Sequence, residues 1–371
     1  MLIKKTTQGL MLALALTTGF TQAAEARDLR LAPGVVQFHP GYNPLYTEFQ
    51  TQLPKQSGGK LSGRMLGVEA VSISGMRTGL SSGLVDVGPF LPAYFPADLP
   101  EMNLVGDLAF LGDDPQAMGA AMTEYIVTCG DCQNELRKLG ITYTSSYSSN
   151  IYHVLSTKPI KDKADLKGMR LRVGGPQFSR WVEAMGATPV STPVTETFEA
   201  LSQGVIDGTV TSSADIVSFR LDDTVGYISS INLGTYHSVI THAVNAKTWK
   251  SLSADERKAI AVSSTLSGAL ATDRWTEISA EAEKKDVEII EPSAELVEAT
   301  NAFVESDLGV AAAQAGERYG IEHAAEKIAR FQKLVDKWHS ISEEVEGDSA
   351  MMAQAVNREV WDKVDFSTYG I

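Results

Sequence analysis

Two arginines, Arg170 and Arg172, alternate with apolar residues over 169–173, and a Gly-Gly-Pro turn follows them. This period-two alternation predicts a short strand whose arginines lie on the face opposite the apolar one. The glycines would end the strand and let the backbone approach a bound group closely. A guanidinium placed there can bind a carboxylate through two parallel hydrogen bonds. On spacing alone, the alternative is a pair of solvated arginines on a strand face.

The segments after this strand alternate between helix and strand. The predicted elements are a helix over 177–185, a strand over 188–190, a helix over 196–203 and a strand over 205–210. Such alternation predicts a parallel sheet with right-handed crossovers. The segment 80–86 repeats the pattern of 201–207, in which a helix end, a glycine and a buried strand lead to an aspartate. We therefore expect two lobes built on one βαβ plan.

Four segments, taken in order, resemble the DctP-type solute-binding proteins of TRAP (tripartite ATP-independent periplasmic) transporters. They are 158–173, 184–190, 199–208 and 249–253, within a looser similarity from about residue 29 to residue 292. The resemblance implies an α/β fold of the two-lobed, type II-like periplasmic binding proteins. It implies mixed sheets flanked by helices, a hinge of several crossing segments and a long C-terminal helix that bridges the lobes. In that family the arginine matching Arg172 forms the main salt bridge to the ligand carboxylate, and Arg170 has no such role.

Residues 1–23 have the pattern of a secretory signal peptide, with a basic start, a short apolar core and cleavage after Ala23 or Ala26. The alternative is an uncleaved anchor. No later apolar run is long enough to span a membrane, so we predict export to the periplasm. Without residues 1–23, which hold two of the 32 basic residues, the chain has 30 basic and 46 acidic side chains, a net charge of −16. Such a chain repels nucleic acid, and it needs a local positive pocket to bind an anion.

The predicted organisation follows from the order of these elements. Lobe I covers 24–150 and returns over about 236–270, lobe II covers 151–235, and a mainly helical region over 271–371 packs on both lobes. The run 254–288, rich in Ala, Glu and Lys, is the candidate for the bridging helix, and ordinary packing helices are the alternative.

Three first-lobe residues in loops are candidates for the ligand site. The resemblance implies first-lobe ligand contacts in the loop of His39, and the loop of Phe90 and Tyr94 lies at the carboxyl end of a strand, where ligands bind in α/β sheets. His39 lies in an aromatic loop, and Phe90 and Tyr94 lie in a proline-rich one; each loop could instead pack on itself or over the core. Glu69 stands where the family often has a ligand-facing glutamine. A carboxylate there would repel a carboxylate but accept a hydroxyl or a cationic group. The alternative is an acid at a helix start.

The second lobe departs from the family pattern in two places. Many members carry a second arginine in the crossover between the lobes, and this sequence has none, so Asn150, Tyr152 or His153 must take that place. Tyr152 and His153 point to opposite sides of a strand, so at most one faces the cleft. Thr211 matches a ligand-contacting asparagine of the family, and its hydroxyl can still donate one hydrogen bond. Tyr236, at the return crossing, completes the set of candidates.

Cys129 and Cys132 are the two cysteines of the chain. Their spacing admits a redox motif, half of a zinc site or a local disulfide. No matching Cys or His pair supplies further zinc ligands, and no thioredoxin pattern surrounds them. In an exported protein we expect a structural disulfide.

The resulting hypothesis is a binding protein that closes on a small organic anion, a monocarboxylate, and delivers it to integral-membrane TRAP permease subunits. The sequence has no nucleophile elbow, no metal-spaced histidine cluster and no glycine-rich phosphate loop. We therefore predict no enzyme activity, no catalytic residue, no cofactor and no nucleic-acid partner. Two alternatives are a sensor component that passes its ligand to a receptor and a periplasmic enzyme on the same fold.

Overall fold

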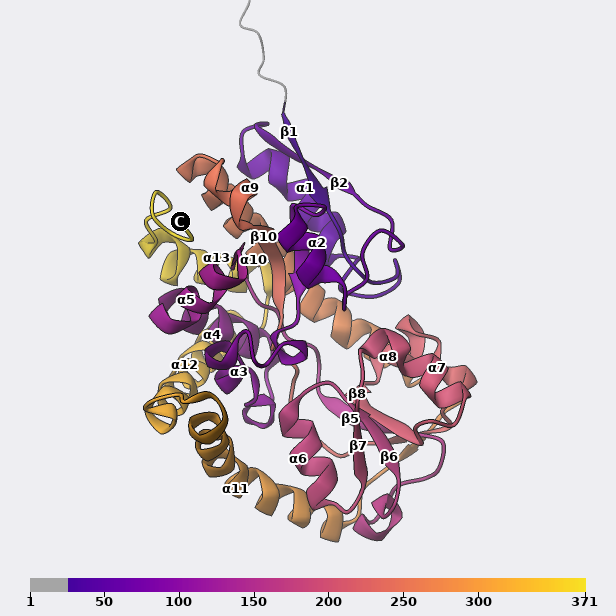
Figure 1. Cartoon of the computed structure of the whole chain (residues 1–371). Coiled ribbons are helices and arrows are strands. Elements are labelled where there is room, and N and C mark those ends of the chain that lie inside the picture. Colours follow the sequence, from indigo (N-terminus) through magenta and orange to yellow (C-terminus); the bar gives the residue numbers. More distant parts are fainter. Residues whose placement is uncertain (1–25) are drawn as a thin grey trace, which may run out of the picture.

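The structure is a computed structural model that describes residues 26–371, so the predicted signal peptide lies outside the described residues. Within that range the strands form two separate sheets (Figure 1). The five-stranded sheet has the order β2 (Leu61–Met65), β1 (Arg27–Leu31), β3 (Val87–Phe90), β10 (Ile240–Asn245) and β4 (Ile141–Thr142). The six-stranded sheet has the order β11 (Glu288–Ile290), β9 (Tyr227–Ser229), β5 (Tyr152–Ser156), β8 (Gly208–Ser212), β6 (Arg170–Val173) and β7 (Thr188–Ser191).

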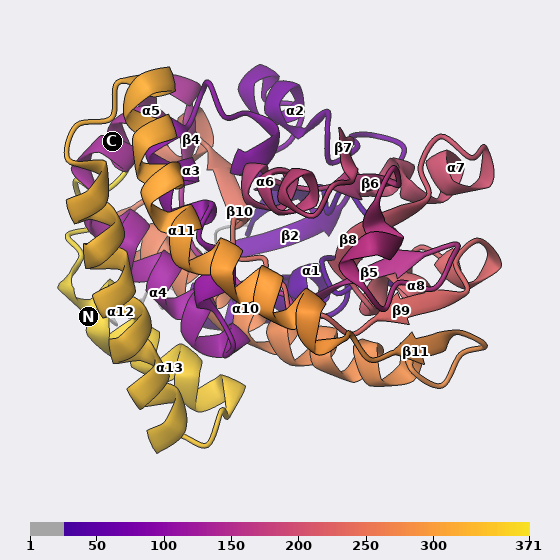
Figure 2. The ribbon, with the colours of Figure 1, turned by 90° about the horizontal axis from the view of Figure 1, so that it is seen from below.

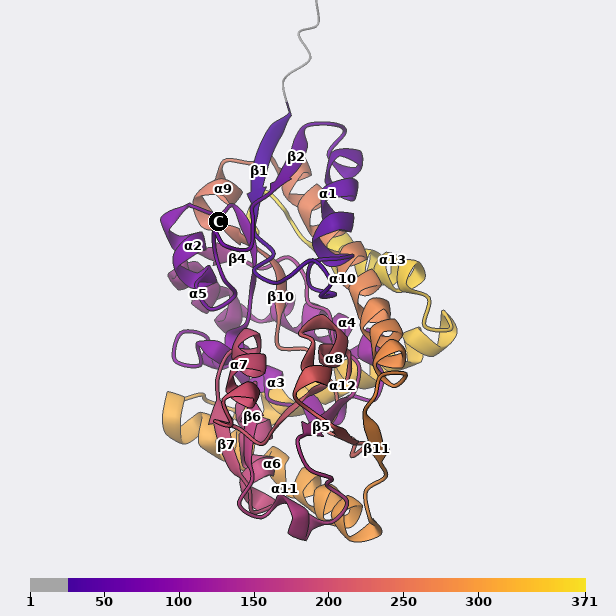
Figure 3. The same cartoon turned by 90° about the vertical axis from the view of Figure 1, so that its right-hand side faces the viewer.

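Both sheets are mixed. In the first, β1 runs parallel to β2 and β3, whereas β10 runs antiparallel to β3 and β4. In the second, β6 is parallel to β7 and β8, and β5 is antiparallel to β8 and β9. The chain therefore has two lobes, one around each sheet, which lie one above the other in Figure 3. The predicted two-lobed α/β fold is confirmed.

Helices cover both sheets. The first lobe holds α1 (Leu45–Gln56), α2 (Met76–Ser82), α3 (Pro100–Gly106), α4 (Pro115–Thr128), α5 (Gly130–Leu139) and α9 (Ala246–Lys250). The second holds α6 (Pro176–Ala184), α7 (Thr197–Ser202) and α8 (Ala214–Ser218). The C-terminal helices are α10 (Ala254–Ala282), α11 (Ala294–Tyr319), α12 (Ala324–Glu344) and α13 (Ser349–Glu359). Across residues 26–371, none of the helices is long and apolar enough to cross a membrane.

The helix α10 joins the two lobes. It begins with a capping box, in which the Ser253 side chain accepts from the Glu256 N–H and the Glu256 carboxylate accepts from the Ser253 N–H. It packs against α1 in the first lobe and α8 in the second (Figure 2). The predicted bridging helix is therefore confirmed. The chain then adds β11 to the edge of the second sheet, parallel to β9, a strand that the helical pattern of this region did not predict.

The two lobes carry the same arginine–aspartate pair, which involves the aspartates at the ends of the two repeated segments. Asp86 Oδ2 accepts from the N–H and the Nε of Arg30, at 2.9 and 2.8 Å. Asp207 Oδ2 accepts from the N–H and the Nε of Arg170, at 2.9 and 3.0 Å. In each lobe the aspartate that directly precedes one strand thus binds an arginine of a neighbouring strand, near the end of β1 in the first lobe and at the start of β6 in the second. Arg170 is consequently engaged at the entrance of β6.

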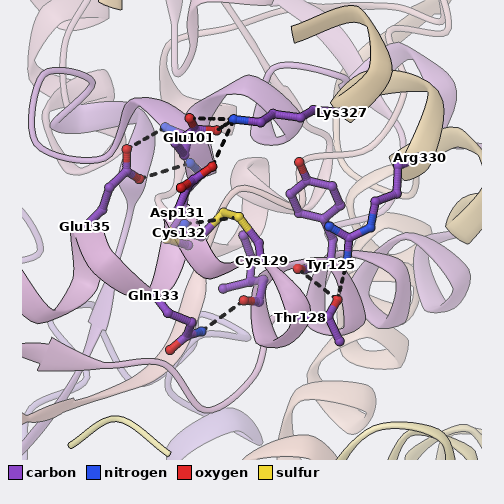
Figure 4. Close-up of a disulfide and its surroundings, with 12 residues drawn as sticks. Glu101, Tyr125, Thr128, Cys129, Asp131, Cys132, Gln133, Glu135, Lys327 and Arg330 are labelled. Carbon is purple, nitrogen blue, oxygen red and sulfur yellow. Dashed lines mark hydrogen bonds and ion pairs between the residues drawn. A yellow bond between two sulfur atoms is a disulfide. The ribbon is translucent and has the colours of Figure 1, made fainter. Parts of the chain in front are cut away.

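A disulfide joins Cys129 to Cys132 at the junction of α4 and α5. Figure 4 shows its surroundings, where Lys327 of α12 binds Glu101 at 2.7 Å and Asp131 at 3.2 Å. The disulfide therefore lies beside the contact between the C-terminal helices and the first lobe, and neither cysteine lines the cavity between the lobes.

Candidate functional site

A cavity lies between the two lobes. It encloses about 660 Å³ of space free of protein atoms, part of it open to solvent. First-lobe loops that follow β1 and β3 line one side, and second-lobe residues that follow β6 and β8 line the other. The crossing segments and α10 supply the rest of the wall. A ligand held there would contact both lobes, as expected for carboxyl-end sites in α/β sheets.

Arg172 is the cationic centre of this cavity. Its side chain is almost fully buried, with 2% of the residue exposed. Nε donates to the Thr192 carbonyl at 2.9 Å, and Nη2 donates to the Tyr94 hydroxyl at 3.3 Å. A guanidinium has five N–H donors, so three have no protein acceptor among the described residues. Arg172 also forms no ion pair with any described carboxylate. A buried charge in this state requires a counter-charge.

A second buried arginine, Arg257, has a structural role, and its hydrogen bonds can be compared with those of Arg172. Arg257 donates to the carbonyls of Trp249, Lys250, Phe366 and Ser367. Its donors are thus used to join the α9 region to the C-terminal segment. Arg172 differs because its free donors belong to a residue that lines a cavity.

The chain after β6 leaves space for the Arg172 side chain. A Cβ at Gly174 would lie 3.2 Å from Arg172 Nη2 and 3.4 Å from Nη1. A side chain at this position would therefore crowd the guanidinium. The sequence predicted that the glycines after this strand allow close approach of a bound group. At Gly174 the group that approaches is the Arg172 side chain.

Four other predicted site residues line the cavity with Arg172: His39, Tyr94, Tyr152 and Tyr236. The Tyr94 hydroxyl also accepts from the Val194 N–H at 3.0 Å, so this first-lobe side chain bonds to the second lobe across the site. The rings of Tyr152 and Tyr236 stack with centroids 5.8 Å apart. His39 Nδ1 accepts from the Gly41 N–H at 2.9 Å, and burial lowers the pKa of His39 to about 3, so its ring is neutral.

Three predicted site residues lie elsewhere. Phe90 belongs to the core of the first lobe and packs on Phe95. Thr211 is buried behind the cavity wall and donates from Oγ1 to Asp215. Glu69 lines a separate, more open groove together with exposed Phe38 and Phe198. Of the crossover candidates, Tyr152 faces the cavity, whereas His153 bonds through Nδ1 to the Ile231 carbonyl at 3.0 Å.

Three functional candidates were missed by the sequence reasoning: Asp215, Tyr147 and Trp275 all line the cavity. Asp215 lies three residues after the end of β8, in the first turn of α8, so its position near the carboxyl end of a sheet strand was a usable signal. Trp275 lies within α10, where a buried aromatic on a long helix gives no sequence signal that separates a pocket wall from a core contact.

Asp215 is a buried acid near the arginine. Burial raises the pKa of Asp215 to about 6, while the Thr211 hydroxyl and the Arg172 charge oppose that rise. Its Oδ2 accepts from Thr211, and its Oδ1 has no hydrogen-bond partner. The cavity thus holds one cation and one acid that are not paired with each other.

The raised pKa of Asp215 predicts how the free energy of unfolding of the ligand-free protein depends on pH. Between about pH 4 and pH 6 the folded state holds a proton on Asp215 that the unfolded state releases, so this contribution to stability falls as pH rises through the window. We expect the free energy of unfolding of Asp215→Asn, relative to wild type, to rise by roughly 2–3 kcal/mol from pH 4 to pH 7.5. Urea unfolding at both pH values measures this, and a difference independent of pH would contradict it.

A comparison with protein families identifies the family of this chain. The model of the family described as bacterial extracellular solute-binding protein, family 7 (DctP), matches residues 40–310. This match includes both sheets apart from β1, and it includes the residues named above as lining the cavity apart from His39.

Relatives and solved structures agree with this assignment. A solute-binding protein of Roseobacter denitrificans is 31% identical over 131 residues, which cover 34% of this chain and 39% of that protein. The chain thus matches less than half the length of that curated relative. A TRAP periplasmic solute-binding protein of Bordetella bronchiseptica, solved with mandelate, has a TM-score of 0.73 at 24% identity, covering 84% of this chain and 99% of that one.

A TRAP solute-binding protein of Rhodoferax ferrireducens, solved with copurified benzoate, has a TM-score of 0.74 at 20% identity, covering 85% of this chain and 99% of that one. At such identities the solved structures establish the two-lobed fold alone. Because the family model matches more than half of the sequence, the chain belongs to the DctP family of bacterial extracellular solute-binding proteins, family 7, which serve TRAP transporters.

Proposed function

We propose that this protein is the periplasmic binding subunit of a TRAP transporter, which captures a small organic monocarboxylate in the interlobe cavity and delivers it to the membrane permease. The observation that carries the proposal is the buried Arg172, three of whose N–H donors have no acceptor among the described residues. A carboxylate accepts two parallel hydrogen bonds from such a guanidinium. The solved relatives that hold mandelate and benzoate show that the fold accommodates monocarboxylates elsewhere.

One carboxylate is expected on the ligand because one cation lines the cavity. His39 is neutral at physiological pH, and no lysine is among the lining residues of the described chain. Capture proceeds by lobe closure, in which the ligand stabilises the closed state by contacting both lobes. Tyr94 contributes to that closure because its hydroxyl bonds to Arg172 and to Val194 of the other lobe. The protein binds its ligand without converting it.

A thermal-shift screen of the mature protein tests the proposal. Organic acids are screened beside their uncharged amides, together with sugars and cations. A ligand present at about 100 times its Kd adds roughly 2.7 kcal/mol to the free energy of unfolding, which raises Tm by a few degrees. We expect shifts with acids and none with the matching amides. Shifts confined to sugars, cations or amides would contradict the proposal.

A further inference from the structure

Asp215 gives the cavity a second charged contact, opposite in sign to Arg172. It is 1% exposed, its Oδ2 is bonded to the Thr211 hydroxyl, and its Oδ1 has no partner among the described residues. Asp215 and Arg172 line the same cavity but form no ion pair. A buried carboxylate oxygen without a donor is costly. A ligand that brings a hydrogen-bond donor to this oxygen would remove that cost.

The rest of the wall leaves few polar groups for a ligand. The Tyr236 hydroxyl is buried and has no hydrogen-bond partner within residues 26–371, although its ring is held by stacking on Tyr152. Apolar side chains such as Val35, Ile73 and Leu91 form much of the remaining surface. A pocket with an apolar wall and a few placed polar groups orients its ligand through those groups. Here they include a cation, an acid, the Tyr236 phenol and the indole N–H of Trp275, which also has no partner among the described residues.

We propose that Asp215 binds a hydrogen-bond donor of the ligand, so that the substrate class is a monocarboxylic acid carrying a hydroxyl or an ammonium group. This inference rests on the proposed function, because the carboxylate must occupy Arg172 for the second group to reach Asp215. A dicarboxylate fits poorly, since its second carboxylate would meet the charge of Asp215 and no second cation of the cavity wall. The sequence suggested that a hydroxyl or cationic group of the ligand would face Glu69. In this proposal that group faces Asp215 instead.

Matched sets of acids test this by isothermal titration calorimetry of the purified mature protein. The sets are propionate, lactate and alanine; phenylacetate, mandelate and phenylglycine; and benzoate, 3-hydroxybenzoate and 3-methoxybenzoate. Within a set that binds, the donor preference is the Kd of the parent acid divided by the Kd of its hydroxyl or ammonium derivative. A hydrogen bond to a charged group supports an expected preference of roughly 10-fold or more. The methoxy compound keeps the oxygen but lacks the donor, so it should show no preference.

Substitutions of Asp215 test whether the donor preference depends on this side chain. In Asp215→Ala we expect the donor preference to fall below about 3-fold, because the acceptor is gone. Asp215→Asn keeps the shape and an acceptor oxygen without the charge, so the preference for an ammonium group should fall more than that for a hydroxyl. This second variant keeps the test decisive if Asp215→Ala fails to fold. Asp131→Asn is the matched control, because Asp131 is an exposed acid beside the disulfide, remote from the cavity.

The possible outcomes distinguish failure of the inference about Asp215 from failure of the proposed function. If acids bind to the wild type with equal affinity for parent and donor-bearing members, the inference about Asp215 is wrong while the proposed function stands. A preference that persists in both Asp215 variants overturns the inference in the same way. If no acid of any set binds, the proposed function fails and the inference fails with it.

Discussion

Arg172→Ala is expected to lower the affinity for the carboxylate ligand by at least about 30-fold. Removing one partner of a buried, hydrogen-bonded charge pair typically costs 2–5 kcal/mol, part of which reflects the other charge left unpaired. Arg172→Lys keeps the charge but loses the planar fork, so we expect an intermediate loss. Titration calorimetry with the tightest-binding acid of the screen measures both values.

The chain offers a control for this variant on the same strand. Arg170 lies two residues earlier in β6, is exposed, and is bound to Asp207 through Nε and Nη2. Arg170→Ala should therefore keep the affinity within about 3-fold, because this guanidinium does not reach the cavity. If Arg172→Ala also stayed within that range, the anchor assignment would be wrong.

The stability of Arg172→Ala separates a binding role from a structural one. In the ligand-free protein at about pH 5, where Asp215 with its pKa of about 6 is mostly protonated, Arg172 is a buried charge without an ionised partner among the described residues, and removing such a charge relieves a desolvation cost. We expect the ligand-free variant to unfold at the same urea concentration as wild type or a higher one. Loss of affinity without loss of stability is typical of residues held for function.

Arg180→Ala should have the opposite effect, a loss of roughly 3–5 kcal/mol in the free energy of unfolding. Arg180 of α6 binds Asp307 of α11 through Nε at 2.6 Å and Nη2 at 2.7 Å, and it binds Asp107 through Nη1 at 2.7 Å. All three side chains are nearly buried. Burial raises the pKa of Asp107 to about 6 against the attraction of Arg180. Without the guanidinium, two buried carboxylates would face each other uncompensated.

The ion pairs of Arg180 with Asp107 and Asp307 join three parts of the molecule. Asp107 follows α3 of the first lobe, Arg180 belongs to the second lobe, and Asp307 belongs to the C-terminal region, so the arginine ties three parts of the molecule together. Arg77→Ala is the matched control, because Arg77 pairs with Asp98 at the surface, where such pairs are worth about 0–1 kcal/mol. Urea unfolding of both variants is compared. An equal loss in the two would show that the buried network contributes nothing beyond a surface pair.

Local patterns predicted those parts of the fold that short-range physics determines. The alternation at Leu171 predicted β6, and the Ala-, Glu- and Lys-rich run over 254–288 predicted α10. The repeat of a glycine and an aspartate in two segments predicted paired lobes, and the structure adds the reason, since each aspartate binds a neighbouring strand. The strand β11 was missed because its pairing with β9 joins segments distant in the chain.

The cavity was harder to predict, because a side chain's neighbours depend on how the lobes meet. Phe90 and Tyr94 lie in one proline-aromatic loop, yet one packs into the first-lobe core and the other reaches Arg172. Thr211 and Asp215 are four residues apart, and the hydroxyl predicted to contact the ligand instead donates to the acid that lines the cavity. The geometry of the loops at the strand ends determines which of these side chains reaches the cavity, and that geometry has no periodic signal in the sequence.

A crystal structure of the protein with the tightest-binding acid of the screen tests the central claim most directly. The account predicts density for the ligand in the interlobe cavity, with both carboxylate oxygens within about 3.2 Å of Arg172 guanidinium nitrogens, the range of a charge-assisted hydrogen bond. A ligand bound in the outer groove beside Glu69, or one bound in the cavity with its carboxylate turned away from Arg172, would contradict it.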